Sequence, residues 1–212
     1  EMIPGDDFDL GEDDSALYYA DWDVVGIMFR DWKPAQSHNI SIQGTSGKTS
    51  YFLSVGYNHE EGVMTFNPDK LNKYNANMNV TSDITNWLQI GGRFSYSDKA
   101  YTTPNTRRNT YTYMWRWGSF FGPYGTYQGI DMKNDIAYLK QAGDDKTNDS
   151  YTRIGAFLKA TIIKGLTLNA DYTFNINNKT TKSVGLPVIC WNSWGGKLNT
   201  PTTAAGANGD TW

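Results

Sequence analysis

The chain has 212 residues, a formal net charge of −3 and 39% hydrophobic residues, and it has no apolar run near the roughly 20 residues of a transmembrane helix. The negative charge gives no electrostatic support for a nucleic-acid partner, and the single Cys190 excludes an internal disulfide framework and a cysteine-based metal cluster. Aromatic residues make up 15% of the chain, which suits either the aromatic girdles of a membrane barrel or a sugar-binding surface.

Residues 1–33 are acidic and aromatic and lack a clean period, so we interpret them as an extracellular surface loop. The carboxylates of this loop predict either a Ca²⁺ site or a solvated acidic surface, and their spacing is not that of an Asp-x-Asp-x-Asp-Gly calcium loop. The chain starts without a basic n-region or an apolar h-region and stops in Gly- and Thr-rich sequence, so we expect a fragment of a longer protein.

Six segments then alternate apolar and polar residues with a period of two, which predicts β-strands. In the second segment, for example, Tyr51, Leu53, Val55 and Tyr57 share one face. Residues 34–98 hold four strands in two hairpins, and residues 149–177 hold a third hairpin. The predicted strands are 37–44, 49–60, 71–82, 87–98, 149–163 and 166–177.

The connections between these strands alternate in length. The turns after the first, third and fifth strands are short, the connection after the second is longer, and residues 99–148 and 178–212 form long loops. A transmembrane barrel has this parity, with short periplasmic turns and long extracellular loops, whereas a β-sandwich distributes its loops without it. The pattern therefore predicts an all-β fold, an antiparallel up-and-down segment of a transmembrane β-barrel whose first, third and fifth strands run toward the periplasm.

The face opposite the apolar one is too hydrophilic for a dry core. We predict that it faces the lumen and binds water or a plug, with a direct transport role for single residues as the second interpretation. Even barrels of about eight strands have interiors filled with side chains, so six strands with this polar face must form an arc of a larger barrel. The predicted lumen-facing residues are Asn75, Asn77, Asn79, Gln89, Arg93, Lys159, Asn169 and Asp171.

Residues 29–98 also carry a recognisable order of short motifs. They include Phe29-Arg30, the run from Pro34 to Gly44, the run from Lys48 to Tyr57 with Glu61-Gly62, the run from Asn72 to Val80, and Asn86 to Gly91. This third of the chain resembles the barrel domain of SusC/RagA-like TonB-dependent outer-membrane transporters of Bacteroidetes. The hairpin at 149–177 fits that family only generically.

The resemblance implies a cell outer-membrane location and a complete barrel of about 22 strands with a plug domain and a TonB box, neither of which is recognisable in these residues. It further implies import of glycans, or of oligopeptides in some members, with energy delivered through TonB. A SusD-like surface lipoprotein is implied as the lid over the extracellular face.

Two aromatic groups in the long loops are the candidates for substrate contact. Exposed rings stack on sugars or hold peptide side chains, and Arg hydrogen-bonds polar groups. The other interpretation is a small core that folds the loops onto the barrel rim. The candidate residues are Tyr111, Tyr113, Trp115, Arg116, Trp117 and Tyr124 in the first loop and Trp191 and Trp194 in the second.

No motif predicts catalysis, so we expect a protein that is not an enzyme and that needs no cofactor or metal. The rival hypothesis is a soluble β-sandwich carbohydrate-binding module, which the aromatic loops and the low charge permit. A secreted glycan-active enzyme ranks last, because no convincing carboxylate pair lies at a strand end.

Overall fold

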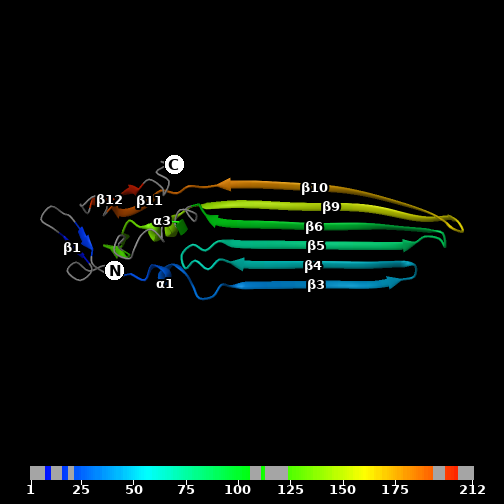
Figure 1. Cartoon of the computed structure of the whole chain (residues 1–212), viewed down its shortest axis with the longest axis horizontal. Coiled ribbons are helices and arrows are strands. Elements are labelled where there is room, and N and C mark those ends of the chain that lie inside the picture. Colours follow the sequence, from blue (N-terminus) through cyan, green and yellow to red (C-terminus); the bar gives the residue numbers. More distant parts are fainter. Residues whose placement is uncertain are drawn as a thin grey trace.

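The computed structural model describes residues 8–10, 16–18, 22–105, 111–112, 124–192 and 199–204. One long antiparallel sheet forms most of the molecule, and short helices and hairpins gather at one of its ends (Figure 1). At the other end only tight turns join the strands (Figure 1). We call the six long strands the wall, and we call residues 22–34, 62–69, 124–143 and 184–192 the rim.

The wall is an antiparallel meander: wall strands that are consecutive in the chain are hydrogen-bonded neighbours in the sheet. Their order is β10-β9-β6-β5-β4-β3, so the chain crosses the sheet step by step from one edge to the other. This arrangement confirms the predicted up-and-down topology. The strands are β3 (Ala35–Ser46), β4 (Thr49–Glu61), β5 (Lys70–Asp83), β6 (Leu88–Pro104), β9 (Asp144–Ile163) and β10 (Leu166–Ser183).

Three strands run farther toward the rim than the alternation predicted. β6 ends at Pro104 rather than at 98, β9 begins at Asp144 rather than at 149, and β10 ends at Ser183 rather than at 177. The prediction stopped where both faces become polar, but the backbone ladder continues to the pairs Pro104↔Asp144 and Ser183↔Asp145. Hydrogen bonding between strands, rather than apolar periodicity, therefore sets these ends.

The tight turns have simple local causes. Gly47 and Gly165 adopt φ values of 60° and 92°, a region that glycine enters without a steric penalty. In the turn between β5 and β6, the Thr85 hydroxyl accepts hydrogen bonds from the backbone N–H groups of Trp87 (3.3 Å) and Leu88 (3.0 Å). These turns keep the hairpins in register at the end away from the rim.

The register joins the apolar faces of all six strands into one surface. One row across the sheet, each residue directly opposite the next, reads Ile42, Leu53, Met78, Phe94, Ile154 and Phe174. Leu53 is 44% exposed and Met78 is 43% exposed, and no described element covers this face. So large a contiguous apolar surface is unusual for a protein in water and typical of an interaction surface or a membrane surface.

Among the described residues, the wall has two unpaired edges. β3 pairs only with β4, and β10 pairs only with β9. A long strand with a free row of backbone N–H and C=O groups is a ready template for another strand. Both edges are therefore suited to continue the sheet.

The rim contains nearly all of the buried core, and the short elements lie within it or at the same end of the sheet (Figure 1). Residues 99–148, expected as an almost unpatterned loop, include a hairpin and a helix in addition to the strand ends. The short elements are β1 (Phe8–Leu10), β2 (Ala16–Tyr18), α1 (Val24–Met28), β7 (Thr126–Tyr127), β8 (Ile130–Asp131), α3 (Asp135–Gln141), β11 (Val188–Asn192) and β12 (Asn199–Ala204). None of the helices in the described part of the chain has the length and apolar character needed to cross a membrane.

Candidate functional site

The polar face of the wall carries all eight predicted lumen-facing residues. Asn75, Asn77 and Asn79 follow one another on β5, opposite Ser97, Ser95 and Arg93 of β6. Gln89, Lys159 and Asn169 lie side by side in one cross-strand row, and Asp171 lies opposite Phe157 on the same face. Residues directly opposite one another in antiparallel strands share a face, so the register brings these side chains onto one hydrophilic surface.

Hydrogen bonds order the middle of this surface. The Asn77 amide donates to the Ser54 hydroxyl (3.4 Å), and the Ser95 hydroxyl donates to the Asn77 carbonyl oxygen (2.9 Å). Ser54 is buried although it lies on the polar side. Nearer the turns, the Gln89 amide donates to Asp83 (2.8 Å). A polar side chain that is held by its neighbours presents a defined pattern of donors and acceptors to whatever fills the space opposite.

One ion pair stands over an aromatic ring on the same face. The Arg93 guanidinium donates to the Asp171 carboxylate at 3.1 Å and lies 4.7 Å from the centroid of the Phe157 ring. The Phe157 ring leans over Gly91, where an added Cβ would come within 2.2 Å of it. Gly91 is thus needed for this close approach, and Phe157 gives the polar face a flat apolar platform that the alternation rule did not predict.

The rim is built on a cluster of buried side chains from three separate connections. Met28 comes from α1, Met64 from the β4–β5 connection, and Ile136 and Leu139 from α3. Val24, Ile27, Phe29, Phe66 and Tyr124 pack around them. This cluster packs side chains of the long connections against one another at the end of the wall. A small core that folds the loops onto the end of a barrel would have this arrangement.

Side-chain hydrogen bonds hold both ends of α3. At its start the Asn134 carbonyl oxygen accepts from the backbone N–H of Ala137 (2.8 Å), as an N-cap residue does. At its end the Asn67 amide donates to the carbonyls of Leu139 (3.3 Å) and Ala142 (3.4 Å), and the Leu139 carbonyl also accepts from the backbone N–H of Ala142 (3.4 Å). A helix of this length is marginal by itself, so these contacts and the packing of its buried face stabilise it.

A second cluster holds Trp191, one of the predicted substrate-contact residues. Trp191 is only 9% exposed and packs with Met132, Trp22, Tyr127 and Ile130. Its indole N–H donates to the carbonyl of Tyr127 at 2.8 Å. These surroundings are those of a side chain packed in a small core rather than those of an exposed ring.

The structure describes two of the other predicted substrate-contact residues, Tyr111 and Tyr124. Tyr111 is 52% exposed, and its ring makes an edge-to-face contact with Phe29 at 6.5 Å. Tyr124 is half-buried in the rim, with its ring edge-to-face against Trp22 at 5.6 Å. Five predicted residues lie outside the described part of the chain: Tyr113, Trp115, Arg116, Trp117 and Trp194. Tyr111 is therefore the described aromatic candidate that is open to solvent.

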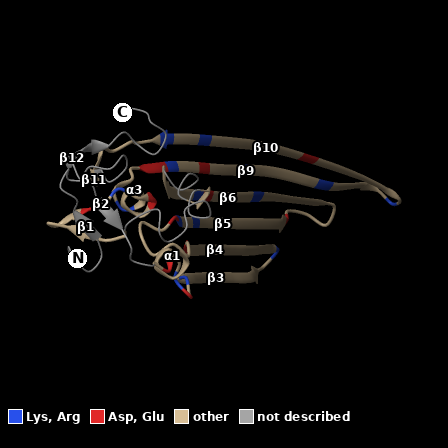
Figure 2. Ribbon diagram, turned by 60° about the vertical axis from the view of Figure 1, so that its left-hand side comes forward, with Lys and Arg blue, Asp and Glu red and all other residues tan. Residues whose placement is uncertain are grey.

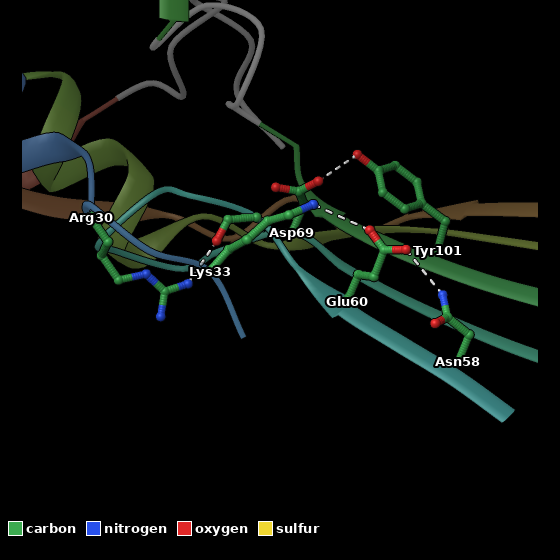
Figure 3. A network of polar contacts seen from close by, with 7 residues as sticks. Arg30, Lys33, Asn58, Glu60, Asp69 and Tyr101 are labelled. Carbon is green, nitrogen blue, oxygen red and sulfur yellow. Dashed lines mark hydrogen bonds and ion pairs between the residues drawn. The ribbon is translucent and has the colours of Figure 1, made fainter. Parts of the chain in front are cut away.

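Polar contacts join the rim to the rim-side ends of β4 and β6 (Figure 3). The Arg30 guanidinium donates to the carbonyl of Gly62 (2.7 Å), and the Tyr101 hydroxyl donates to Asp69 (2.9 Å). Glu60 accepts from Asn58 and from Lys33, and these two contacts, with Asn58 contributing most, lower the pKa of the carboxyl below its usual value. These contacts anchor the segment before β3 and the β4–β5 connection to the strand ends.

Burial changes three ionisable groups in the rim. It raises the pKa of the Asp135 carboxyl to about 6 and, with smaller contributions from Cys190 and Asp135, the pKa of the Tyr138 hydroxyl to about 12. Burial also raises the pKa of the Cys190 thiol. The cause in each case is the loss of water around the charged form.

Metal binding has no support within the described residues, where no group of three His, Cys, Asp or Glu side chains lies in a ligating arrangement. The acidic stretch considered for Ca²⁺ contains Asp6, Asp7, Asp9, Glu12, Asp13 and Asp14. The side chains of these six residues lie outside the described part of the chain. The Ca²⁺ hypothesis stays a prediction.

Four charged residues at the rim-side ends of the strands were not among the predicted site residues. They are Lys73 on β5, Lys99 on β6, Asp149 on β9 and Lys179 on β10, and the register places them in one row on the polar face. Lys99 and Lys179 lie beyond the predicted strand ends at 98 and 177. Continuing the period of two into the polar strand ends would have placed each of them on this face, but only the register shows that they are neighbours.

No family model and no curated protein matches the chain. Solved structures do match. A structure of the RagAB peptide transporter aligns with a TM-score of 0.58 and 22% identity over 76% of this chain and 19% of that chain. A structure of the RagAB peptide importer in the 'closed-closed' state aligns with a TM-score of 0.63 and 21% identity over 82% of this chain and 21% of that chain.

At this identity the likeness is one of fold. The chain spans about a fifth of the length of the structures it matches. The wall is built like an antiparallel segment of a RagA-like barrel, in agreement with the predicted fold class.

Proposed function

We propose that this chain forms part of the barrel of a TonB-dependent importer that takes up oligopeptides or glycans across the outer membrane. The observation that carries the proposal is the contrast between the two faces of the wall. One face is apolar across six strands and uncovered by any described element, and the other is lined with Asn, Ser, Arg, Lys and Asp. A barrel wall between lipid and a watery lumen needs this contrast.

The height of the apolar face matches a membrane. Outward-facing apolar residues of β10 extend from Leu166 to Ile176. At about 3.3 Å per residue this stretch rises about 33 Å, and a strand tilt of about 40° leaves about 25 Å along the membrane normal. That value agrees with the apolar band of about 25 Å in outer-membrane barrels.

The free edges of β3 and β10 support a barrel larger than the described sheet. A membrane leaves no water for unpaired backbone groups, so both edges need partner strands. Six strands are also too few to enclose the polar face. We therefore assign the wall to an arc of a barrel of about 22 strands, the number that the sequence resemblance implies.

In this proposal the rim lies outside the cell and the tight turns lie in the periplasm. Cargo binds between the rim loops and a plug, with Tyr111 among the first aromatic contacts. A SusD-like lipoprotein closes over the rim, and TonB moves the plug to open a path along the polar face. Binding and gated passage break no covalent bond, so no catalytic group is needed.

One observation favours oligopeptides over glycans as cargo. The proteins of similar fold are described as a peptide transporter and a peptide importer.

Spin labels test the membrane assignment directly. In the complete protein in lipid vesicles, labels at Leu53, Met78, Ile90 and Leu158 are expected to report a lipid environment. Labels at Asn77 and Asn169, on the polar face, are expected to report water. Equal water accessibility at all six positions contradicts the proposal.

The rival proposal, a soluble β-sandwich carbohydrate-binding module, requires a second sheet over the apolar face. In the described part of the chain nothing covers Leu53, Met78 or Ile154. A segment 1–212 that is soluble and monomeric without detergent and binds glycan would favour the sandwich instead.

A further inference from the structure

We propose that a row of lysines on the polar face forms a carboxylate-binding site that selects acidic oligopeptides. The row consists of Lys73, Lys99, Asp149 and Lys179, and each residue lies directly opposite the next on strands β5, β6, β9 and β10. This inference rests on the importer function proposed above, and it adds the charge class of the cargo.

The row has more positive charge than its neighbours neutralise. Lys73, Lys99 and Lys179 make no ion pair with any residue that the structure describes. Lys73 and Lys99 face each other across β5 and β6, and like charges in directly opposite positions destabilise a sheet. A bound anion removes this repulsion, so the site is suited to a negatively charged ligand.

A further cation lies on the same face, closer to the turns than the row. Arg153 is four residues from Asp149 on β9, with Tyr151 between them on this face; it lies opposite Ser95 and Asn175, and it too lacks an ion pair among the described residues. Deeper in the wall the situation differs, because Asp171 pairs with Arg93 at 3.1 Å. Lys159 is a polar-face cation near the turns that also lacks an ion pair among the described residues, so most of the unpaired positive charge, but not all of it, lies in or near the row.

The position of the row suits a first contact for cargo. Lys73 precedes Tyr74, which ends the apolar band on β5, and Lys179 lies beyond Ile176, which ends it on β10. Figure 2 shows charged residues on β5, β6, β9 and β10 toward the rim, whereas β3 is free of them along its length. Cargo that enters from the rim side therefore meets the row before the neutral middle of the wall.

The dimensions of the row suit several carboxylates on one chain. Strands lie about 4.8 Å apart, so the three steps from β5 to β10 span about 14 Å, the length of about four residues of an extended peptide. Lysine is a compact charge on a flexible stem, so it accepts a carboxylate without a fixed angle of approach. Rings of charged side chains select ions of the opposite sign in other membrane pores by the same physics.

The test compares two octapeptides that differ only in having Glu or Gln at three positions. Titration calorimetry on the complete protein in detergent at low salt is expected to show that the Glu peptide binds about tenfold or more tightly. In the triple variant Lys73→Gln, Lys99→Gln, Lys179→Gln, the preference is expected to fall to about twofold or less, with the affinity for the Gln peptide unchanged. Raising the salt concentration is expected to weaken only the Glu preference of the unmodified protein.

The double variant Lys146→Gln, Lys182→Gln is the matched control. These lysines lie opposite each other on β9 and β10 toward the rim but on the other face of the sheet, so the Glu preference is expected to survive their loss. A shift in gel mobility on heating, typical of folded barrels, verifies the fold of every variant. This measurement separates loss of charge from loss of structure.

Three outcomes overturn the inference. The first is equal binding of both peptides by the unmodified protein, which leaves the importer function standing. The second is a Glu preference that persists in the triple variant. The third is charge-dependent binding of oligogalacturonate with no binding of either peptide, which moves the carboxylate site to acidic glycans. Failure to bind any of the three ligands contradicts the proposed function itself.

Discussion

In the wall, Leu53 and Met78 keep more than two-fifths of their surface exposed, whereas in the rim Leu139 and Met28 are completely buried. The same kinds of side chain thus behave in opposite ways within one chain. In the rim they exclude water from a small core and hold three connections together. In the wall the backbone ladder holds the strands, and the apolar side chains stay exposed. Under the proposed function lipid covers these side chains, so the two regions are adapted to different solvents.

A cavity in the rim should destabilise the protein most. Leu139→Ala removes a fully buried side chain and is expected to destabilise the rim by about 2–5 kcal/mol. Hydrogen exchange over residues 135–141 in the complete protein measures this loss as faster exchange. The matched change Leu53→Ala on the exposed face of the wall is expected to leave exchange in β4 nearly unchanged. Equal effects at the two sites would remove the distinction between wall and rim.

A charge on the apolar face gives the next largest effect. Met78→Arg places a cation near the middle of the apolar band and is expected to cost about 2–4 kcal/mol in a bilayer. Asn77→Arg, one residue away on the polar face, is expected to cost far less. Urea unfolding in lipid vesicles, followed by tryptophan fluorescence, compares the two variants. A larger cost for the Asn77 variant would invert the assignment of the faces.

The rim alone is expected to depend on mildly acidic pH. Burial raises the pKa of Asp135 from 3.8 to about 6, so the folded rim binds this proton more tightly than the unfolded chain does. The contribution of this proton to the stability of the rim is therefore complete below about pH 4 and is lost as the pH rises through about 6. The total loss of stability is up to about 3 kcal/mol, and it levels off above that pH.

Hydrogen exchange of α3 at pH 5 and pH 7.5, corrected for the intrinsic pH effect, measures this dependence. Asp135→Asn, which cannot ionise, is expected to remove it, while exchange in the wall strands stays the same in both proteins. A pH dependence that survives this substitution assigns the effect to another group.

The smallest expected effect is at the helix cap. Asn134→Ala removes the acceptor for the Ala137 N–H and is expected to cost about 1 kcal/mol of local rim stability. Asn134→Asp keeps an acceptor in the same place and serves as the control. Protease cleavage of the rim, with the wall protected in detergent, distinguishes the two variants. Equal cleavage of both would show that the cap contributes little.

Local patterns in the sequence were enough to predict the six strands, their order and their faces. The direction of a side chain in a strand depends only on whether its position is odd or even, so one sequence shows which residues share a face. The eight predicted lumen-facing residues all lie on one face for this reason. Gly47 and Gly165 likewise mark tight turns through a property of a single residue.

The candidate site was only partly predictable. The aromatic loops were recognised as a group, but composition does not distinguish an exposed ring such as Tyr111 from a buried one such as Trp191. That distinction depends on Met132 and Tyr127, which lie about sixty residues before Trp191 in the chain. Periodicity has no information on such distant contacts.

The division of the wall into an apolar and a polar face follows from the sequence alone, because that property repeats every two residues. Which polar residues become neighbours depends on the folded sheet, since register is a relation between strands and not within one. Register aligned Lys73, Lys99, Asp149 and Lys179 into a single row. Packing, in turn, joined Met28 to Leu139 in the rim, because burial of side chains from distant segments depends on how the whole chain closes.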